Sequence, residues 1–391
     1  MIIPNAETFS IGAADSALVS SGLGNTTRIA HTKSGNVEAL ERRVGRYDLQ
    51  TQAARLLLGE RVGLCLKQMT APARGVEVIH HADTQSANFR GLMVCGSVWS
   101  CPICAARITE KRRIELSGGV DSWRAKGGGV ALASFTLRHS HDDRLKPLRA
   151  DLAKAWRYMS SAREFQRLKG DYQIIGSVSS FEVTHGASGW HTHKHALFFT
   201  ARTLTEGELL ALEGELARIW LKQLARVGRD GLSGVAVRVS SAEASEAAAA
   251  YVTKWSITHE LVKSPVKRGR EGGLSPFELL ADSLDNPASG RLFKEYFFAM
   301  KGSHQLQFTR GLRELLGLGE QATDAELAAA ETDETAQVIL TIPAEIWREV
   351  CRLDLRGEII RRASAGDGEA LQLWLCDELE RAGAPPGQNQ Y

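Results

Sequence analysis

The chain has 391 residues, enough for two or three packed units that bury their own cores without disulfide bonds. Hydrophobic residues make up 43% of the chain and charged residues 24%, as in an ordinary soluble globular protein. No stretch of about eighteen apolar residues appears, so we expect no membrane span. The first residues lack the basic and apolar regions of a secretory signal, and we therefore expect a cytoplasmic protein.

The net charge of +2 is unevenly distributed along the chain. Residues 317–391 contain six Arg and no Lys against fifteen Asp and Glu, a net charge of −9, which leaves +11 for residues 1–316. A polyanion is therefore an expected partner of the first part alone, and we expect the acidic part to contact protein. The alternative is that both sets of charges only solvate surfaces.

The part of the chain before residue 130 shows no pattern typical of strands. Residues 1–36 are rich in Ser, Gly, Thr and Asn and are expected to form a loose leader. Apolar residues at helical intervals predict a packing helix over 37–58, which Gly59 ends. A cysteine-bearing segment follows, and a basic helix is predicted over 105–123.

The pattern then changes to alternating strands and helices. Strands are predicted over 130–139, 173–184, 190–200 and 235–239, and helices over 148–168, 205–226 and 241–259. The order β-α-β-β-α-β-α predicts an α+β fold of the ferredoxin-like or RRM-like type, with an antiparallel sheet and helices on one face. We expect this core to span residues 126–260.

Two segments follow the core. A basic, Gly-rich linker and a helical extension are expected over 261–317, where Ser275 and Glu278 predict a capping box at the start of a helix. Residues 318–391 are expected to form a small acidic helical unit, because apolar residues from Ile342 onward recur at helical spacing.

Three histidines alternate along the strand predicted over 190–200. His191, His193 and His195 share one face, since alternate side chains of a strand point the same way. A short turn before this strand sets Glu182 opposite His193, about 5 Å away. Two imidazoles and a carboxylate suit a divalent metal that acts as a Lewis acid, so His193, His195 and Glu182 are the candidate ligands, with His191 as a further one. Ordinary surface histidines are the alternative.

The helix predicted over 241–259 carries a tyrosine and a lysine one turn apart. Lys254 lies three residues after Tyr251 on the same helix face, where its charge can stabilise a phenolate. A tyrosine of this kind near a metal is equipped to attack phosphorus, which makes Tyr251 and Lys254 the candidate catalytic residues. Without a metal nearby, a helical tyrosine usually packs in a core.

Three of the six cysteines lie within ten residues, Cys95, Cys101 and Cys104, and Cys65 precedes them by thirty positions. The candidate zinc ligands are Cys65, Cys95, Cys101 and Cys104. Four thiolates satisfy tetrahedral Zn²⁺ without other help, so residues 37–125 are expected to be a helical and zinc-binding segment. His80 and His81 are rivals for the place of Cys65, and a redox-active CxxC pair is the other interpretation.

Several stretches occur in an order found in a known family. They are CGSVWSCPICAARITEKRR, FTLRH, GWHTHKHALFF, YVTKW, SPFELL and GLRELLG, from about residue 60 to 317. Together they resemble the bacterial plasmid rolling-circle replication initiators (Rep proteins) of the His-hydrophobe-His (HUH) endonuclease superfamily. The resemblance implies that FTLRH is the first sheet strand, that His193 and His195 bind the metal, and that Tyr251 is the nucleophile. It implies nicking of one strand at a plasmid origin, a 5′-phosphotyrosine intermediate and a 3′-hydroxyl primer.

Three positions depart from the family pattern. Lys194 stands where the motif has a hydrophobe, and Trp255 stands where a second tyrosine often follows. Ala247 occupies the position at which some relatives carry a glutamate thought to direct water at termination. The resemblance therefore implies a single-tyrosine enzyme, with another group serving the second cleavage.

The expected cofactors are Mn²⁺ or Mg²⁺ for catalysis and Zn²⁺ for structure. The expected partners are single-stranded and hairpin DNA at a plasmid origin, a host polymerase, and a host helicase, because no GxxxxGK[ST] phosphate loop is present. The candidate phosphate contacts are Lys111, Arg112, Arg113, Lys263, Lys267, Arg268 and Arg270. Rival functions are a conjugative relaxase or single-tyrosine transposase, and a non-enzymatic zinc-bearing DNA-binding protein.

Overall fold

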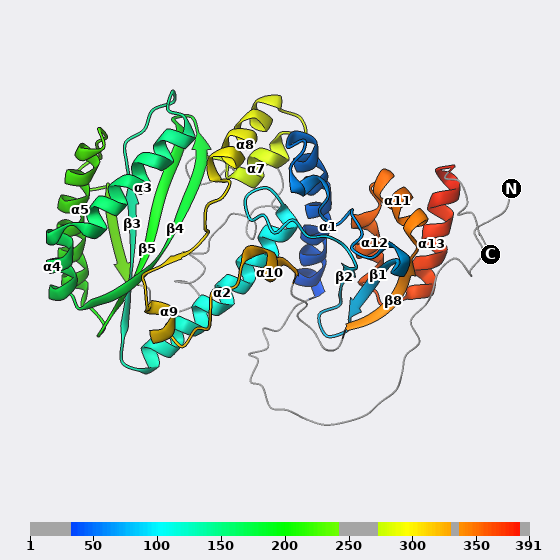
Figure 1. Ribbon diagram of the computed structural model, residues 1–391, viewed down its shortest axis with the longest axis horizontal. Coiled ribbons are helices and arrows are strands. Elements are labelled where there is room, and N and C mark those ends of the chain that lie inside the picture. Colours follow the sequence, from blue (N-terminus) through cyan, green and yellow to red (C-terminus); the bar gives the residue numbers. More distant parts are fainter. Residues whose placement is uncertain (1–32, 242–272, 330–335, 384–391) are drawn as a thin grey trace. The chain divides into compact units, whose positions relative to one another are not determined.

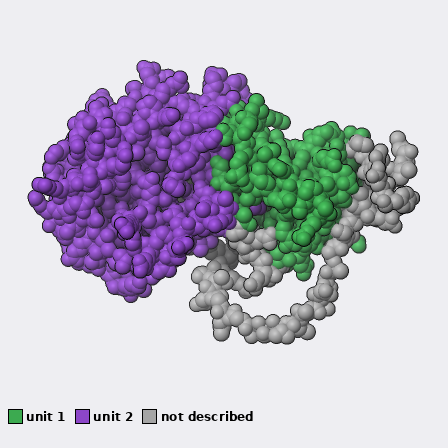
Figure 2. All heavy atoms as spheres, viewed as in Figure 1, with its two compact units in different colours: residues 1–97, 101–104, 328–391 green, residues 98–100, 105–327 purple. Residues whose placement is uncertain are grey.

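The computed structural model describes residues 33–241, 273–329 and 336–383, and Figure 1 labels its helices and strands. The chain divides into two compact units, shown in green and purple in Figure 2. Unit 1 comprises residues 1–97, 101–104 and 328–391, and unit 2 comprises residues 98–100 and 105–327. Unit 1 is thus built from both ends of the chain. None of the described helices combines the length and the hydropathy that crossing a membrane requires.

Unit 1 contains a three-stranded antiparallel sheet with helices packed against it. The strands stand in the order β2-β1-β8. The elements are α1 (Lys33–Leu56), η2 (Arg61–Gly63), η3 (Pro72–Arg74), β1 (Val76–His81), β2 (Ser86–Arg90), β8 (Ala336–Ile342), α11 (Ala344–Arg352), α12 (Arg356–Ala363) and α13 (Gly368–Arg381). The helix predicted over 37–58 is confirmed as α1.

The segment 318–391 was expected to be helical, and the structure differs by placing a strand in it. Strand β8 pairs with β1, so that Ile342 lies opposite Val76. The Trp347 side chain of α11 is buried, and its Nε1 donates to the Lys67 carbonyl at 2.8 Å. Helical spacing correctly indicated α11, but local periodicity cannot reveal a strand whose partner lies near the other end of the chain.

Unit 2 contains a five-stranded sheet in the order β6-β3-β5-β4-β7, with every neighbouring pair antiparallel. The elements from its start are α2 (Pro102–Ala125, which begins in unit 1), β3 (Gly129–Thr136), α3 (Leu145–Ser161), α4 (Arg163–Asp171), β4 (Ile174–Gly186), β5 (Gly189–Thr200), α5 (Glu206–Arg226) and β6 (Val237–Ser241). They continue with α7 (Pro276–Asp282), α8 (Pro287–Met300), β7 (Gln307–Phe308), α9 (Leu312–Leu315) and α10 (Asp324–Ala329). The predicted α+β class with an antiparallel sheet is confirmed.

Local differences from the predicted elements have simple causes. The single helix predicted over 148–168 is divided into α3 and α4, because Ala162 between them has extended backbone angles (φ −69°, ψ 137°). The short turn predicted between β4 and β5 contains only Ala187 and Ser188, since Gly186 and Gly189 already pair. Gly189 has φ +86°, and a Cβ there would lie 2.9 Å from the His141 Cα, so this position requires glycine. The predicted helix over 241–259 lies outside the described residues.

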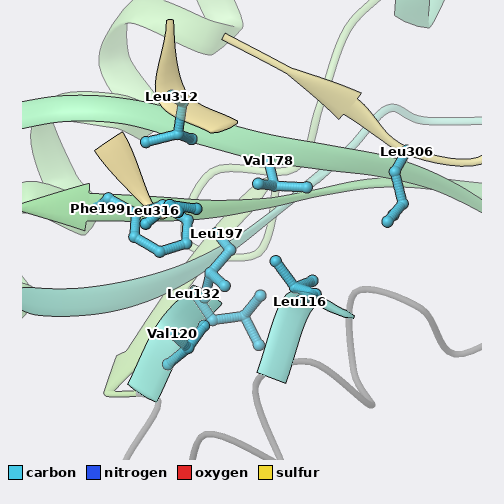
Figure 3. Close-up of a cluster of buried hydrophobic side chains, with 9 residues drawn as sticks. All are labelled: Leu116, Val120, Leu132, Val178, Leu197, Phe199, Leu306, Leu312 and Leu316. Carbon is cyan, nitrogen blue, oxygen red and sulfur yellow. The ribbon is translucent and has the colours of Figure 1, made fainter. Parts of the chain in front are cut away.

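The two faces of the five-stranded sheet have different neighbours. On one face, Phe135 contacts Trp156 of α3 and Trp220 of α5, with ring centroids 5.2 and 5.3 Å apart. On the other face lies a buried apolar cluster that includes α2 and α9, shown in Figure 3. Its members are Leu116, Val120, Leu132, Val178, Leu197, Phe199, Leu306, Leu312 and Leu316. Helices therefore pack on both faces of the sheet, so the prediction of helices on one face was wrong. The second face continues along β5 from the apolar cluster to the histidines.

Candidate functional site

The histidines of β5 form a row on one face of the sheet. His191 and His193 stack with centroids 4.2 Å apart and planes 14° apart, and His193 and His195 lie 5.7 Å apart at 5°. His139, which follows β3, extends the row with its ring 4.8 Å from that of His191. The predicted sharing of one face is therefore confirmed, and the fourth imidazole was missed because its position depends on where the chain turns after β3.

Glu182 lies across the strand pair from this row. The predicted register holds, with Glu182 opposite His193. The carboxylate nevertheless contacts the next histidine, because its Oε2 lies 2.6 Å from Nε2 of His195. The other ring nitrogen of His195, Nδ1, lies 2.9 Å from the Oγ of Ser134, which stands opposite it on β3. Hydrogen bonding to Ser134 orients the ring so that Nε2 faces the carboxylate.

The electrostatics of the row favour a neutral ring at His193. Burial, reinforced by the neighbouring His191 and His195, lowers the pKa of His193 to about 4. At neutral pH this ring is uncharged and retains a lone pair, as a metal ligand requires. Two imidazoles and a carboxylate on adjacent strands are a donor set that fits a divalent cation with further coordination positions free. These residues are not gathered as tightly as the cysteines, since the ligand atoms of no three of them lie within 4.8 Å of one another.

The four cysteines converge into one buried cluster in unit 1. Cys65 follows η2, Cys95 follows β2, Cys101 precedes α2, and Cys104 lies in the first turn of that helix. All four sulfurs lie within 4.8 Å of one another, and it is the one such group of three or more His, Cys, Asp and Glu among the described residues. The shortest Sγ–Sγ distances are 3.5 Å between Cys65 and Cys104 and 3.6 Å between Cys95 and Cys104.

The geometry of the cluster fits a tetrahedral metal. Four sulfurs at the Zn–S bond length would lie about 3.8 Å apart, close to the distances found here. The amide N–H of Cys95 donates to Sγ of Cys65 at 3.3 Å, and hydrogen bonds from Cys101, Cys65 and Cys95 hold the pKa of the Cys104 thiol well below its usual value. The four cysteines can therefore bind a structural metal such as zinc. The rivals His80 and His81 belong to β1 and are not part of the cluster.

The candidate phosphate contacts on α2 have partners within the protein. The Arg112 side chain is 5% exposed and pairs with Asp324 at 2.6 Å. This differs from the prediction, because a buried guanidinium that is already ion-paired is not presented to a phosphate. Lys111 donates to the Leu327 carbonyl at 3.0 Å, and Arg113 pairs with Glu110 one turn earlier on the helix surface.

The remaining predicted site residues lie outside the described residues. They are Tyr251, Lys254, Lys263, Lys267, Arg268 and Arg270.

Lys194 faces away from the histidines. Because it alternates with His193 and His195, its side chain lies on the face covered by α3, where it is buried beneath Trp156, with Nζ 5.3 Å from the ring centroid. Its Nζ also donates to Oε1 of Gln307 at 3.2 Å. Burial lowers the pKa of Lys194 to about 8. The lysine thus fills, with its aliphatic stem, the inward position that a hydrophobe would occupy.

Two known proteins are similar to this chain. One, named Protein rep, from Streptomyces lividans, is 29% identical over an alignment that covers 76% of this chain and 80% of that protein. The other, a neomycin resistance protein from Streptomyces cyanogenus, is 32% identical over 145 residues, which are 30% of this chain and 32% of that protein. No protein-family profile matches the chain, and no solved structure matches it.

Proposed function

We propose that this protein is a plasmid rolling-circle replication initiator, a HUH endonuclease that nicks one DNA strand at an origin and transfers it to a tyrosine. The observation that carries the proposal is the placement of His193, His195 and Glu182 on adjacent strands of one sheet face. The replication role is supported by similarity along most of the chain to a protein named Protein rep.

The order of the strands supports a HUH core. Four of them stand as β6-β3-β5-β4, with α3 and α4 between β3 and β4 and with α5 between β5 and β6. This order supports the proposed ferredoxin-like split βαβ sheet, in which the first and third strands lie at the centre. The proposed metal ligands are on the third strand and its neighbour, and Ser134 is on the first. The short strand β7 extends the sheet beyond β4.

The proposed metal is Mn²⁺ or Mg²⁺, held by His193, His195 and Glu182, with His191 as a further donor. When bound, such an ion supplies Lewis-acid stabilisation of the charge that develops on the scissile phosphate. The side chain of Ser134 fixes the His195 ring through Nδ1 and leaves Nε2 for the ligand side.

Tyr251 is the proposed nucleophile. Its phenolate oxygen forms a bond to phosphorus, the bond from phosphorus to the 3′ oxygen breaks, and the 3′ oxygen leaves with the electron pair and takes up a proton. The product is a 5′-phosphotyrosine and a 3′-hydroxyl primer. Lys254, one turn along the sequence, is proposed to stabilise the phenolate by its charge. Because bond energy is retained in the phosphotyrosine, the strand can be rejoined or transferred.

The proposal includes further partners and ions. Zn²⁺ would be the structural metal of the cysteine cluster, whose spacing fits four thiolates. The substrate would be single-stranded or hairpin DNA at the origin in the cytoplasm, with a host helicase and polymerase acting with the protein. The proposed phosphate contacts that remain are Lys111, Arg113, Lys263, Lys267, Arg268 and Arg270.

Two other functions predict different outcomes. A relaxase or a single-tyrosine transposase would use the same chemistry on a transfer origin or a transposon end, and the similarity to Protein rep favours replication instead. A zinc-bearing DNA-binding protein without catalysis would keep every activity in the Tyr251→Phe variant.

The test is covalent capture of labelled DNA. The protein is incubated in Mn²⁺ with a set of origin-like hairpins that carry a ³²P label at their 3′ end, on the 3′ side of the nick, and is run on a denaturing protein gel. We expect a labelled adduct that EDTA and Tyr251→Phe each abolish. Tyr158→Phe is the matched control, because Tyr158 lies on α3 and packs beneath Arg226, with the guanidinium 4.1 Å from the ring centroid. Absence of an adduct with every hairpin, or an adduct that survives Tyr251→Phe, would overturn the proposal.

A further inference from the structure

Helix α8 has one buried face and one exposed basic face. Its inner side chains, including Phe293, Tyr296 and Met300, are fully buried. The exposed positions follow at intervals of three or four residues, which places them in one stripe along the helix. The stripe consists of Arg291, Lys294 and Phe298 of α8 and of Lys301, which caps the end of the helix, and we refer to these four residues as the α8 stripe.

The α8 stripe contains an exposed aromatic side chain, Phe298. Phe298 is 57% exposed and is the one aromatic side chain among the large hydrophobic residues exposed in the described part of the chain. Its ring contacts the neighbouring Phe297 edge to face, with centroids 5.1 Å apart. The ring is therefore held in place while much of its surface stays available for a flat partner.

The charge of the α8 stripe is positive. Arg291 and Lys294 make no ion pair with any residue that the structure describes. The acidic residue of the helix, Glu295, is committed elsewhere, because it pairs with Arg144 at 3.2 Å and accepts the amide of Leu145 at 2.9 Å. Cations flanking an exposed aromatic ring therefore present a surface with no competing carboxylate from α8 itself.

The position of α8 relates the stripe to the histidine row. Leu274, just before α7, forms a bridge with His185 near the end of β4, and α7 packs against α8. Glu295 lies near enough to His185 to oppose, by its charge, the lowering of its pKa that burial causes. Figure 1 shows α8 beside this end of β4, where the hairpin leads into the histidines of β5. Because α8 also packs against α3, which covers the face opposite to the histidines, a strand that leaves the histidine row reaches α8 by passing around the hairpin end of β4.

We infer that the α8 stripe binds single-stranded DNA, with a base stacked on Phe298 and phosphates placed at Arg291, Lys294 and Lys301. Alternating cations and an exposed aromatic ring are the features by which proteins hold a single strand, because phosphates need positive charge and unpaired bases need a flat apolar surface. A duplex offers phosphates but keeps its bases stacked inside, so it would use the cations alone. This inference rests on the proposed function, since it supplies a path for the nicked strand.

The test measures binding without cleavage. The full-length protein is titrated against an unstructured fluorescent single strand of about 30 nucleotides, longer than one binding site, and against the corresponding duplex, in EDTA. Anisotropy gives the affinity at several salt concentrations. The variants are Phe298→Ala, Phe298→Trp and the double variant Arg291→Gln/Lys294→Gln. The matched controls are Leu210→Ala, which removes an exposed apolar side chain from α5, and Arg163→Gln/Arg167→Gln, which removes two charges from α4.

The expected results separate the two parts of the stripe. Phe298→Ala should weaken single-strand binding about 5- to 30-fold and leave duplex binding nearly unchanged, and Phe298→Trp should keep single-strand affinity. The double variant should weaken both and reduce the slope of log affinity against log salt by about 1.4 for the single strand. The controls should bind like the wild type.

Three outcomes would overturn the inference, and they can be told apart. If the wild type binds single strands while the stripe variants match the controls, this inference fails and the proposed function stands. If the wild type binds neither single strand nor duplex, both fail. A stripe variant that loses no DNA affinity but no longer associates with a replication protein would assign the stripe to a protein partner instead.

Discussion

In unit 1 four thiols reach one point from three separate segments, whereas in unit 2 three imidazoles lie along a single strand. The sulfurs of the cysteines all lie within 4.8 Å of one another, and the closest pair of β5 histidines has ring centroids 4.2 Å apart but in a stacked row. Loops and a helix N-terminus can bring ligand atoms to a common centre, while a strand spaces same-face side chains by about 7 Å at the backbone. The first arrangement closes around an ion, and the second leaves coordination positions for a substrate.

The groups that form hydrogen bonds with the candidate metal ligands also differ between the two units. Two of the cysteine sulfurs accept hydrogen bonds from backbone amides of other cysteines in the cluster, Cys65 Sγ from Cys95 N–H and Cys101 Sγ from Cys104 N–H. His195 is oriented by side chains of two neighbouring strands, Ser134 and Glu182. The cysteine cluster should therefore respond to loss of metal by unfolding, and the histidine row should respond by losing affinity and activity while the sheet persists.

The largest effect is expected at the cysteine cluster. Cys101→Ser should abolish zinc binding and cost several kcal/mol in the stability of unit 1, because binding of a structural zinc ion contributes directly to folding. Metal analysis and limited proteolysis would measure this. Cys351→Ser, a half-buried cysteine outside the cluster, is the control and should keep the metal. Zinc content unchanged in Cys101→Ser would refute the assignment of this ligand.

A smaller effect is expected from pH at the histidine row. The folded pKa of His193 is about 4, below the value of about 6.5 expected for an unfolded chain, so the unfolded state binds more protons between these values. The free energy of unfolding should therefore be highest above pH 6.5 and fall as the pH drops to 4, by about 3 kcal/mol. Urea unfolding in EDTA would measure this, and His193→Gln should flatten the dependence. An unchanged pH profile in His193→Gln would contradict the proposed burial of this ring.

A still smaller effect is expected when the hydroxyl group that orients His195 is removed. Ser134→Ala removes the hydroxyl that orients His195 and should weaken Mn²⁺ binding about tenfold, with little change in thermal stability. Isothermal titration with Mn²⁺ would measure it, and Ser134→Thr should restore most of the affinity. If Ser134→Ala binds Mn²⁺ like the wild type, the His195 ring needs no such support.

The smallest effect is expected on the other face of the sheet. Lys194→Met should leave the free energy of unfolding unchanged or raise it by up to about 1 kcal/mol, since an apolar side chain avoids the cost of burying a charge. With a folded pKa of about 8, the wild type should gain stability as pH rises from 8 towards 10.5, and Lys194→Met should lose this gain. Chemical denaturation at pH 7 and pH 10 would measure both. A large loss of stability in Lys194→Met would show that the ammonium bond to Gln307 matters more than the stem.

The local sequence pattern correctly predicted which candidate metal-binding side chains lie close together. Alternation along β5 correctly placed three histidines on one face, and counting through the turn correctly paired Glu182 with His193. Spacing alone favoured Cys65 as the fourth member of the cysteine group, and this is confirmed. The capping box of Ser275 and Glu278 is also confirmed. The catalytic roles of Tyr251 and Lys254 stay predictions.

What escaped prediction depends on residues far apart in the chain. The sequence by itself determined which side chains share a strand face or a helix turn, because those relations follow from the period of the backbone. Only the tertiary structure decided that β8 pairs with β1, that the buried Arg112 forms an ion pair with Asp324, and that Ser134 forms a hydrogen bond with His195. Such contacts are selected by packing and charge compensation over the whole unit, and no local period contains that information.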